Sequence, residues 1–300
     1  MTPRDLTASI RDRLQRLARE RGEDFQVTLV RFAIERWLYR LSRTEYRGRF
    51  VLKGAMLFEI WSTKRLRATR DLDLLGRGSS DAESLRRAFE RISAAEVEPD
   101  GLVFDVDSIQ FEDLHEGQDY PGQRIRMTVM LGNVRIPFAA DIAFGQAVTP
   151  EPQETEYPAM LDLPTGRVLA YPQEVAIAEK FQAIVSLGVA NGRMKDFHDV
   201  ALLANMFEFD ERRIASALRA TFERRDTPLP EGVPLALTAE FHEDPDRKRD
   251  WIAFQRRAAV STSSLEQACR RITAFLMPVV ERITAGSEPS RRWRPESGWE

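Results

Sequence analysis

The chain has 300 residues, of which 43% are hydrophobic and 30% charged, and its formal net charge is −3. The length and the apolar fraction suit one large globular domain or two ordinary ones. The single cysteine, Cys269, excludes an internal disulfide and a cysteine metal cluster. No apolar run approaches the roughly 20 residues of a membrane span, and the N-terminus has no signal-peptide pattern. We therefore expect a soluble, cytoplasmic protein.

The charge is unevenly distributed along the chain. Residues 1–50 contain 12 arginines, no lysine and seven acids, for a net +5, whereas residues 210–300 carry +1 and the middle carries −9. Basic flanks around an acidic centre fit a metal-dependent enzyme with a polyanionic substrate. They fit a surface charged for solubility equally well, so both interpretations stay open.

Two amphipathic helices are predicted at the start, over residues 4–20 and 26–43, from apolar spacings of three and four. The second helix carries Arg31, Arg36, Arg40 and Arg43. These arginines either form the solvated face of a core helix or belong to a surface for nucleic acid or a protein partner.

An α+β pattern follows. Residues 50–61 begin as a strand or turn and enter a helix, residues 69–75 read as a strand, and a capping box at Ser80 and Glu83 opens a helix over 81–95. Alternating apolar residues predict further strands, with a hairpin turn at Gly132-Asn133. Those strands cover residues 102–111, 124–131 and 134–144.

A stretch rich in proline and turn residues, 146–170, marks a domain boundary. We expect an N-terminal domain over 1–150, which includes the two leading helices, and a mainly helical domain over 151–300 with a loose tail after Gly286. Pro278 should kink or shorten the last helix. Helices are predicted over residues 172–188, 194–207, 210–223 and 262–285.

The most informative motif is Asp71-Leu72-Asp73, which follows Gly54 by 17 residues. Side chains at i and i+2 of a strand point to the same face, so the two carboxylates lie side by side. A cation relieves their repulsion, and carboxylate oxygens suit Mg²⁺ or Mn²⁺. A third carboxylate is expected when two ions are held. We assign it to Asp141, which lies opposite an apolar row on its strand, with Asp105 and Asp107 as competitors.

Three more segments carry candidate site residues. Lys53 and Gly54 precede a predicted helix, where glycine lets a phosphate approach the backbone. Lys180 flanks the apolar stripe of its helix and is either a triphosphate contact or an ordinary snorkelling lysine. Asp196 and Asp199 share a helical face and are usually solvated in such a pattern. His198 has no partner at metal-ligand spacing, so a zinc site is not expected.

Taken together, these segments resemble the AbiEii/AbiGii (MenT-type) toxin family of nucleotidyltransferases, within the DNA polymerase β-type superfamily. The matching motifs agree with the family in order and spacing and span residues 50–204. The family's second small residue of the glycine turn is Ala55 here, so a serine hydroxyl contact to phosphate is impossible there. The matching segments are Leu52-Lys53-Gly54-Ala55, Arg67 to Asp73, Asp141 to Gly145, Ala178-Glu179-Lys180 and Lys195 to Asp199.

The resemblance implies a polymerase β-like nucleotidyltransferase domain with a small mixed sheet, followed by a helical domain. It implies an enzyme that is the toxin of a toxin–antitoxin system. Such an enzyme uses an NTP with Mg²⁺ or Mn²⁺, has a cognate antitoxin partner, and in some members adds nucleotides to the 3′ end of tRNA and so blocks translation. The site residues it implies are Asp71, Asp73, Lys180 and Asp199 for catalysis, Asp71, Asp73 and Asp141 for metal, and Lys53, Gly54, Ala55, Lys180, Arg193, Lys195 and Asp196 for nucleotide.

Three alternatives are kept at this point. The acceptor is a small hydroxyl compound, or it is a protein, either the toxin itself or its antitoxin. In the third alternative the chain is a non-catalytic regulatory binding protein that keeps the scaffold.

Overall fold

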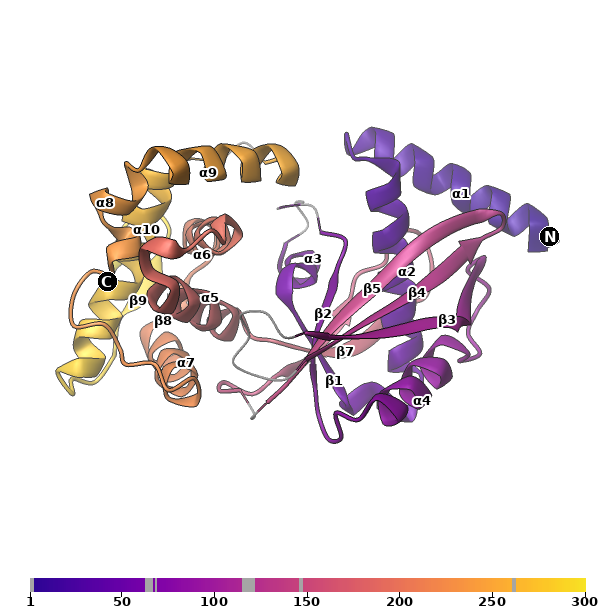
Figure 1. The fold of residues 1–300 in the computed structure, drawn as a ribbon, viewed down its shortest axis with the longest axis horizontal. Helices are drawn as coiled ribbons and strands as arrows, with labels where there is room; N and C mark the ends of the chain where they lie inside the picture. Colours follow the sequence, from indigo (N-terminus) through magenta and orange to yellow (C-terminus); the bar gives the residue numbers. More distant parts are fainter. Residues whose placement is uncertain (1–2, 63–66, 68, 115–121, 146–147, 261–262) are drawn as a thin grey trace. The chain divides into compact units, whose positions relative to one another are not determined.

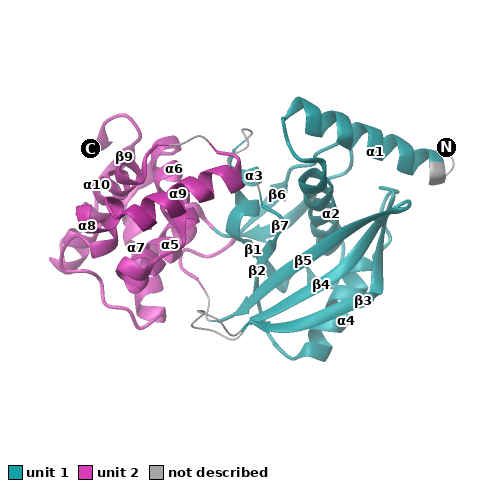
Figure 2. Ribbon diagram, turned by 45° about the horizontal axis from the view of Figure 1, so that its top comes forward, with its two compact units in different colours: residues 1–145, 153–171 teal, residues 146–152, 172–300 magenta. Residues whose placement is uncertain are grey.

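The computed structural model describes residues 3–62, 67, 69–114, 122–145, 148–260 and 263–300. The chain divides into two compact units (Figure 2). Unit 1 comprises Met1–Gly145 and Gln153–Tyr171, and unit 2 comprises Gln146–Pro152 and Pro172–Glu300. The sequence predicted that residues 153–171 belong to the C-terminal domain, but this segment forms two strands that pair with the unit 1 sheet.

Unit 1 is built on a mixed seven-stranded sheet in the order β3-β4-β5-β2-β1-β7-β6 (Figure 1). Strand β2 is central, antiparallel to β1 and parallel to β5. The strands are β1 (Phe50–Lys53), β2 (Leu72–Gly76), β3 (Leu102–Leu114), β4 (Gly122–Leu131), β5 (Val134–Phe144), β6 (Gln153–Tyr157) and β7 (Gly166–Ala170).

Helices α2 (Phe25–Ser42) and α4 (Ala82–Ser93) pack against this sheet, and α1 (Pro3–Glu20) packs on α2. Their starts are fixed locally, because the Asp24 and Asp81 side chains accept hydrogen bonds from backbone N–H groups of the first turn. The core forms around Trp37 of α2, whose ring lies 6.3 Å from Phe50 and 5.8 Å from Phe138. Alternation along β1 and β2 therefore places Lys53 and Asp73 on the opposite face of the sheet.

Three of the four arginines predicted on this helix form neither a solvated face nor a binding surface, whereas Arg43, the residue after α2, is exposed. Arg31, Arg36 and Arg40 are at most 6% exposed. Arg36 and Arg40 both pair with buried Asp100, and Arg31 pairs with Glu23 and Glu59. Burial of these charges is tolerated because each has a carboxylate partner within hydrogen-bonding distance.

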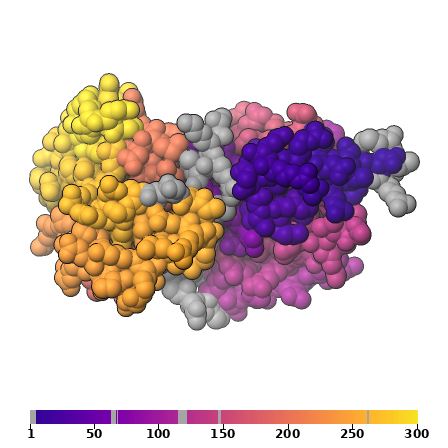
Figure 3. All heavy atoms as spheres, turned by 90° about the horizontal axis from the view of Figure 1, so that it is seen from above, coloured from indigo at the N-terminus to yellow at the C-terminus, as the bar shows by residue number. Residues whose placement is uncertain are grey.

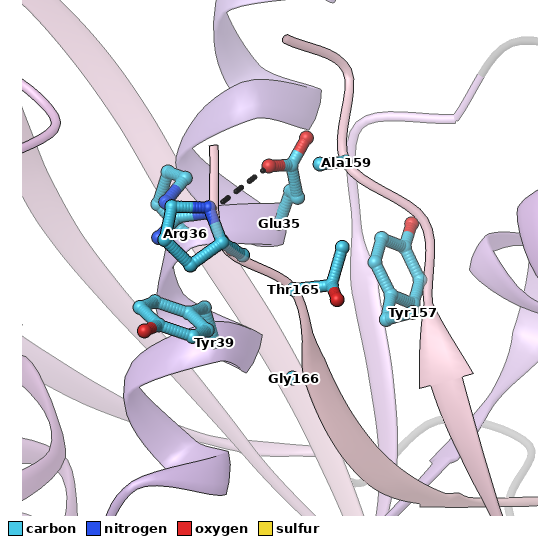
Figure 4. A pocket seen from close by; sticks show the side chains of 8 residues that line it. Glu35, Arg36, Tyr39, Tyr157, Ala159, Thr165 and Gly166 are labelled. Carbon is cyan, nitrogen blue, oxygen red and sulfur yellow. Dashed lines mark hydrogen bonds and ion pairs between the residues drawn. The ribbon is translucent and has the colours of Figure 1, made fainter. Parts of the chain in front are cut away.

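Glu35 lies beside Arg36 in a small pocket of unit 1 (Figure 4). Its carboxylate accepts a hydrogen bond from the Met160 backbone N–H at 2.7 Å and lies 3.4 Å from Arg36 Nη1. Burial nevertheless dominates and raises the pKa of Glu35 to about 7, against the lowering effect of these two partners.

Unit 2 is mainly helical, as predicted, with α5 and α6 packed side by side and α10 packed against α6 and α7. Pro278 lies inside α10, which continues to Thr284. Two helices, α8 and α9, were not predicted, because α8 has only four residues and α9 has few apolar residues among its charged ones. The helices are α5 (Gln173–Leu187), α6 (Met194–Met206), α7 (Glu211–Arg224), α8 (Ala239–His242), α9 (Pro245–Ala258) and α10 (Leu265–Thr284).

The C-terminal tail is ordered, contrary to the expectation of a loose segment after Gly286. Strands β9 (Arg292–Arg294) and β10 (Gly298–Trp299) form a hairpin, and β9 pairs with β8 (Phe209–Asp210). Trp293 is 1% exposed and donates a hydrogen bond to the Ala204 carbonyl at 2.8 Å. A large buried aromatic ring thus fixes a tail whose other residues are mostly polar. Within the described residues, no helix is both long enough and apolar enough to cross a membrane.

Candidate active site

The Asp-x-Asp motif lies at the start of the central strand β2. Leu72 and Leu74 are fully buried and fix the strand in the core. Asp73 is half-buried between them, and Asp71 is exposed just before the strand begins. The alternation that buries the leucines therefore presents the carboxylate of Asp73 on the opposite face of the sheet.

The sheet register aligns four charged residues in one row, which we call the charged row. Asp73 is the partner of Lys53 on β1 and of Asp141 on β5, and Asp141 is the partner of Arg124 on β4. Register partners on adjacent strands point to the same face. Two carboxylates thus lie side by side at the centre of the sheet, with a cation on each side of them.

Arg124 grips both oxygens of Asp141. Its Nε lies 2.6 Å from Oδ1 and its Nη2 lies 2.7 Å from Oδ2, a bidentate geometry. The hydrogen bonds to Asp141 raise the pKa of Arg124 above its usual value, with added electrostatic contributions from Asp141 and Asp71, while partial burial acts in the opposite direction.

The turn after β1 approaches the carboxylate of Asp73. Gly54 has a φ of +70°, and a Cβ atom at this position would lie 1.9 Å from Oδ2 of Asp73. Only glycine therefore lets the backbone come this close to the carboxylate. The turn continues as a 3₁₀ segment, Gly54–Met56, in which Ala55 is buried, and then as α3 (Leu57–Trp61). The helix predicted after the turn is thus only five residues long.

Divalent cation binding can be tested against this donor set. Asp71, Asp73 and Asp141 offer the hard oxygen ligands that Mg²⁺ and Mn²⁺ prefer. Asp73 and Asp141 are neighbours in register. Across the residues that the structure describes, however, no three acidic, histidine or cysteine side chains converge closely enough to hold a metal ion. The residues therefore fit such an ion in donor type and placement, but side-chain rearrangement is needed before all three carboxylates can reach it.

The competitors for the third carboxylate lie farther away. Asp105 and Asp107 are on β3, an outer strand, and both β4 and β5 lie between β3 and β2. Asp105 faces Thr128, whose partner on β5 is Pro137, not Asp141. The register thus favours Asp141 for this role.

Unit 2 holds a second cluster, which we call the lysine cluster. Lys180 of α5 places Nζ 2.9 Å from Oδ1 of Asp196 and 2.9 Å from Oδ2 of Asp199, both on α6. The side chains of the two aspartates are fully buried, whereas that of Lys180 is 15% exposed. The expectation that the aspartate pair could be merely solvated is therefore wrong, since both carboxylates are enclosed with a lysine.

The other motif residues of α6 differ in exposure. Arg193 lies 2.7 Å from Oδ2 of Asp196 through its Nε, and its side chain is 45% exposed. Lys195 is exposed. His198 is 2% exposed, and its Nδ1 lies 3.1 Å from Oδ1 of Asp199.

Two residues that the structure adds to these groups, Arg124 and His198, were not predicted as members of a site. Arg124 could have been predicted from the sequence, because a two-residue turn at Gly132-Asn133 sets a register in which residue 124 faces residue 141. No comparable signal identified His198, because adjacent helical positions normally point in different directions.

Comparison with known proteins shows which family the chain matches and which solved structures share its fold. The family model described as nucleotidyl transferase AbiEii toxin, type IV toxin–antitoxin system, matches residues 36–274. The crystal structure of JHP933 from Helicobacter pylori is similar in fold, with a TM-score of 0.52 and 15% identity over 88% of this chain and 95% of that one. A structure of a proposed nucleotidyltransferase from H. pylori has a TM-score of 0.49 and 16% identity, covering 88% of this chain and 99% of that one. A search of curated proteins found no match.

The chain belongs to the AbiEii family of nucleotidyl transferase toxins, since the match spans most of its length. The predicted family, the α+β fold class and the enzyme class are confirmed, and the alternative of a non-catalytic regulator is set aside. Membership implies an NTP substrate and an antitoxin partner, and members of the family generally use a divalent metal ion.

Proposed function

We propose that this enzyme transfers a nucleoside monophosphate from an NTP to a hydroxyl at the 3′ end of tRNA, and thereby blocks translation. The acceptor oxygen forms a bond to the α-phosphorus, and the bond from that phosphorus to the bridging oxygen of the β-phosphate breaks. Pyrophosphate leaves, and the hydroxyl proton passes to solvent. The charge that develops on these oxygens is what the site must stabilise.

In this proposal Asp71, Asp73 and Asp141 hold Mg²⁺ or Mn²⁺. When bound, the ion would lower the charge on the phosphate oxygens and favour the deprotonated acceptor hydroxyl. The protein's own contribution is placement, because strands β2 and β5 keep two of the carboxylates adjacent through backbone pairing. Arg124 keeps Asp141 oriented in the absence of the ion.

The nucleotide is assigned to two sets of residues. Lys53, with Gly54 and Ala55, contributes a positive charge and backbone amides near the carboxylates, and Lys180 contributes a second charge to the triphosphate. Asp199 orients Lys180 and acts with it in catalysis. The proposed roles of Arg193, Lys195 and Asp196 are contacts to the phosphates, ribose or base.

RNA as the acceptor is supported by α1 of unit 1. Arg11, Arg16 and Arg19 are exposed on this helix, which lies open on the surface in Figure 3. Exposed arginines suit phosphate contacts, which position a nucleic acid without reading its sequence. With Arg31, Arg36 and Arg40 of α2 buried in ion pairs, the exposed basic side chains of the N-terminal segment are those of α1 together with Arg21, Arg43 and Arg47.

One observation carries the proposal more than any other. Asp73, the register neighbour of Asp141, is also the register neighbour of Lys53 and lies against the Gly54 turn. This arrangement supports the proposal, because it sets carboxylates suited to divalent cations beside a positive charge suited to phosphate, and nucleotidyl transfer requires both.

The test is to incubate the protein with total tRNA, MgCl₂ and each α-³²P-labelled NTP in turn. Labelled tRNA is expected with the wild type. Asp73→Asn and Asp141→Asn should reduce labelling at least about a hundredfold, because each removes a proposed ligand but keeps the side-chain volume. Asp105→Asn, on the outer strand β3, is the matched control and should retain activity.

The outcomes separate the alternatives. Label on the protein itself would show that the acceptor is a protein. Label on a small hydroxyl compound, with tRNA unlabelled, would show that the acceptor is such a compound. Full activity of Asp73→Asn would refute the metal assignment.

A further inference from the structure

His198 is the one buried titratable side chain in the lysine cluster to which the proposed chemistry gives no role. It precedes Asp199 on α6, and adjacent helical residues differ by about 100° in direction. Even so, the imidazole is turned so that Nδ1 lies 3.1 Å from Oδ1 of Asp199. The ring of Phe254, on α9, lies 5.3 Å from it and helps to fix that orientation.

The two carboxylates of the cluster are held in different ways. Each gives one oxygen to Lys180, at 2.9 Å. The second oxygen of Asp196 faces the partly exposed cation of Arg193, whereas the second oxygen of Asp199 faces the buried imidazole of His198. Asp199 thus has its geometry fixed on both sides from within the protein core.

The tautomer of His198 follows from its surroundings. A carboxylate only accepts hydrogen bonds, so the proton must be on Nδ1. Nε2 is buried and has no hydrogen-bond partner among the described residues. A second proton on Nε2 would therefore be a buried donor without an acceptor, which is unfavourable. The neutral ring with hydrogen on Nδ1 donates to Asp199 and leaves only the Nε2 lone pair unpaired among the described residues.

We propose that His198 is a positioning residue that directs Asp199 toward Lys180 without competing for its charge. A lysine or arginine in its place would neutralise Asp199 and weaken its attraction for the Lys180 ammonium. A neutral N–H donor orients the Asp199 carboxylate without neutralising its charge. This inference rests on the proposed function of Lys180 and Asp199 in nucleotidyl transfer.

Two amide substitutions test the inference against a packing role. Asparagine places its NH₂ group where Nδ1 lies, one bond from Cγ, whereas glutamine places it near the position of Nε2. His198→Asn should keep kcat within about threefold of wild type. His198→Gln and His198→Leu should lower kcat by roughly ten- to a hundredfold, the range seen when an orienting partner is removed, with a smaller change in KM for the NTP.

A role in packing alone predicts the opposite order, since asparagine is the smaller residue and leaves the larger void. Glutamine performing as well as asparagine would therefore overturn the proposal. Thermal unfolding of each variant checks that the fold is retained.

A second readout does not depend on activity. The chain has only three histidines, so ¹⁵N-histidine labelling gives a simple long-range ¹H–¹⁵N spectrum in which His198 is assigned from its loss in His198→Asn. We expect wild-type His198 as the Nδ1–H tautomer and a shift toward Nε2–H in Asp199→Ala. Nε2–H in the wild type would overturn the proposal. If no acceptor is labelled by the wild type, the proposed function fails, and this spectrum still decides whether His198 orients Asp199.

Discussion

The charged row in unit 1 depends on residue-scale contacts that tolerate little change. Asp73 and Asp141 would repel one another in isolation, and Lys53 and Arg124 offset that repulsion from either side. The backbone of Gly54 fills the space against Asp73 that any side chain would need. The geometry is therefore set by a backbone turn as well as by charge.

Gly54→Ala tests this close approach. The new methyl group would overlap Oδ2 of Asp73, and alanine is also strained at a φ of +70°. We expect a loss of unfolding free energy of at least about 2 kcal/mol and a loss of nucleotidyl transfer. Thermal unfolding and the tRNA labelling assay measure the two effects.

Gly78→Ala is the matched control, because Gly78 also has a positive φ, +81°, but no atom lies within 4 Å of its Cβ position. It should cost about 1 kcal/mol and leave transfer intact. Equal effects at the two glycines would show that conformation, not the contact with Asp73, explains the loss.

Glu35 makes a prediction about pH. Its pKa is raised from 4.5 to about 7 by burial, so the folded protein holds a proton that the unfolded chain releases between these values. Glu35 therefore stabilises the fold most below pH 4.5, and that contribution is lost as pH rises to about 7. Glu35→Gln removes this dependence. The unfolding free energy of the variant minus that of the wild type should therefore be about 3 kcal/mol larger at pH 8 than at pH 4.5.

Urea unfolding of both proteins at the two pH values measures the difference. Other titrating groups are common to both proteins, so their contributions cancel in the difference between the two unfolding free energies. A difference between the proteins that does not change with pH would contradict the raised pKa of Glu35.

At the scale of elements, the C-terminal hairpin of β9 and β10 closes unit 2. The ring of Trp293 packs against those of Phe275 and Trp299 in tilted and edge-on arrangements, with ring centroids 4.8 and 5.5 Å away. Buried Glu211, at the start of α7, accepts hydrogen bonds from Arg291, and these lower its pKa despite opposing burial. The hairpin is thus tied to the helical core by an aromatic anchor and a buried ion pair.

Trp293→Ala is expected to lower the unfolding free energy by about 3–5 kcal/mol, because it removes a fully enclosed ring and one of two side-chain donors to the Ala204 carbonyl, the other being Arg271. Arg294→Ala, on the same strand but exposed, should cost less than about 1 kcal/mol. Denaturant titration of the two variants compares them. Similar small losses in both would mean that the tail contributes little to unit 2.

At the scale of the whole molecule, net charge says little about where a polyanion binds. The chain is slightly acidic overall, and the arginines of α2 are neutralised inside unit 1. The exposed arginines of α1 are the ones that we assign to RNA. Binding through them should depend steeply on salt, since each phosphate contact releases bound counterions.

Replacing Arg11, Arg16 and Arg19 together by glutamine should weaken tRNA binding and reduce the slope of log affinity against log salt by about 0.7 for each phosphate that is no longer neutralised. Replacing Arg87 and Arg91 of α4, which are also exposed, is the control and should leave the slope unchanged. Filter binding over a series of salt concentrations gives both slopes. An unchanged slope in the α1 variant would show that tRNA does not bind through these three arginines.

Local patterns in the sequence were enough to predict most of the elements and the family. Strong apolar periodicity located the helices of unit 1 and the long strands, and the Asp-x-Asp motif with its glycine turn identified the enzyme class. The pairing of Arg124 with Asp141 could also have been predicted, because a two-residue hairpin turn fixes the partner of residue 124 on β5.

Which charges are buried, and which residues are neighbours, became known only from the folded chain. The pairing of β2 with β5, which makes Asp73 adjacent to Asp141, joins segments some 70 residues apart and has no local signal. The same is true of the buried arginines of α2, whose acidic partners come from distant segments, and of Trp293, which orders the tail. Local pattern reports what one segment prefers, whereas burial and register depend on what the rest of the chain places beside it.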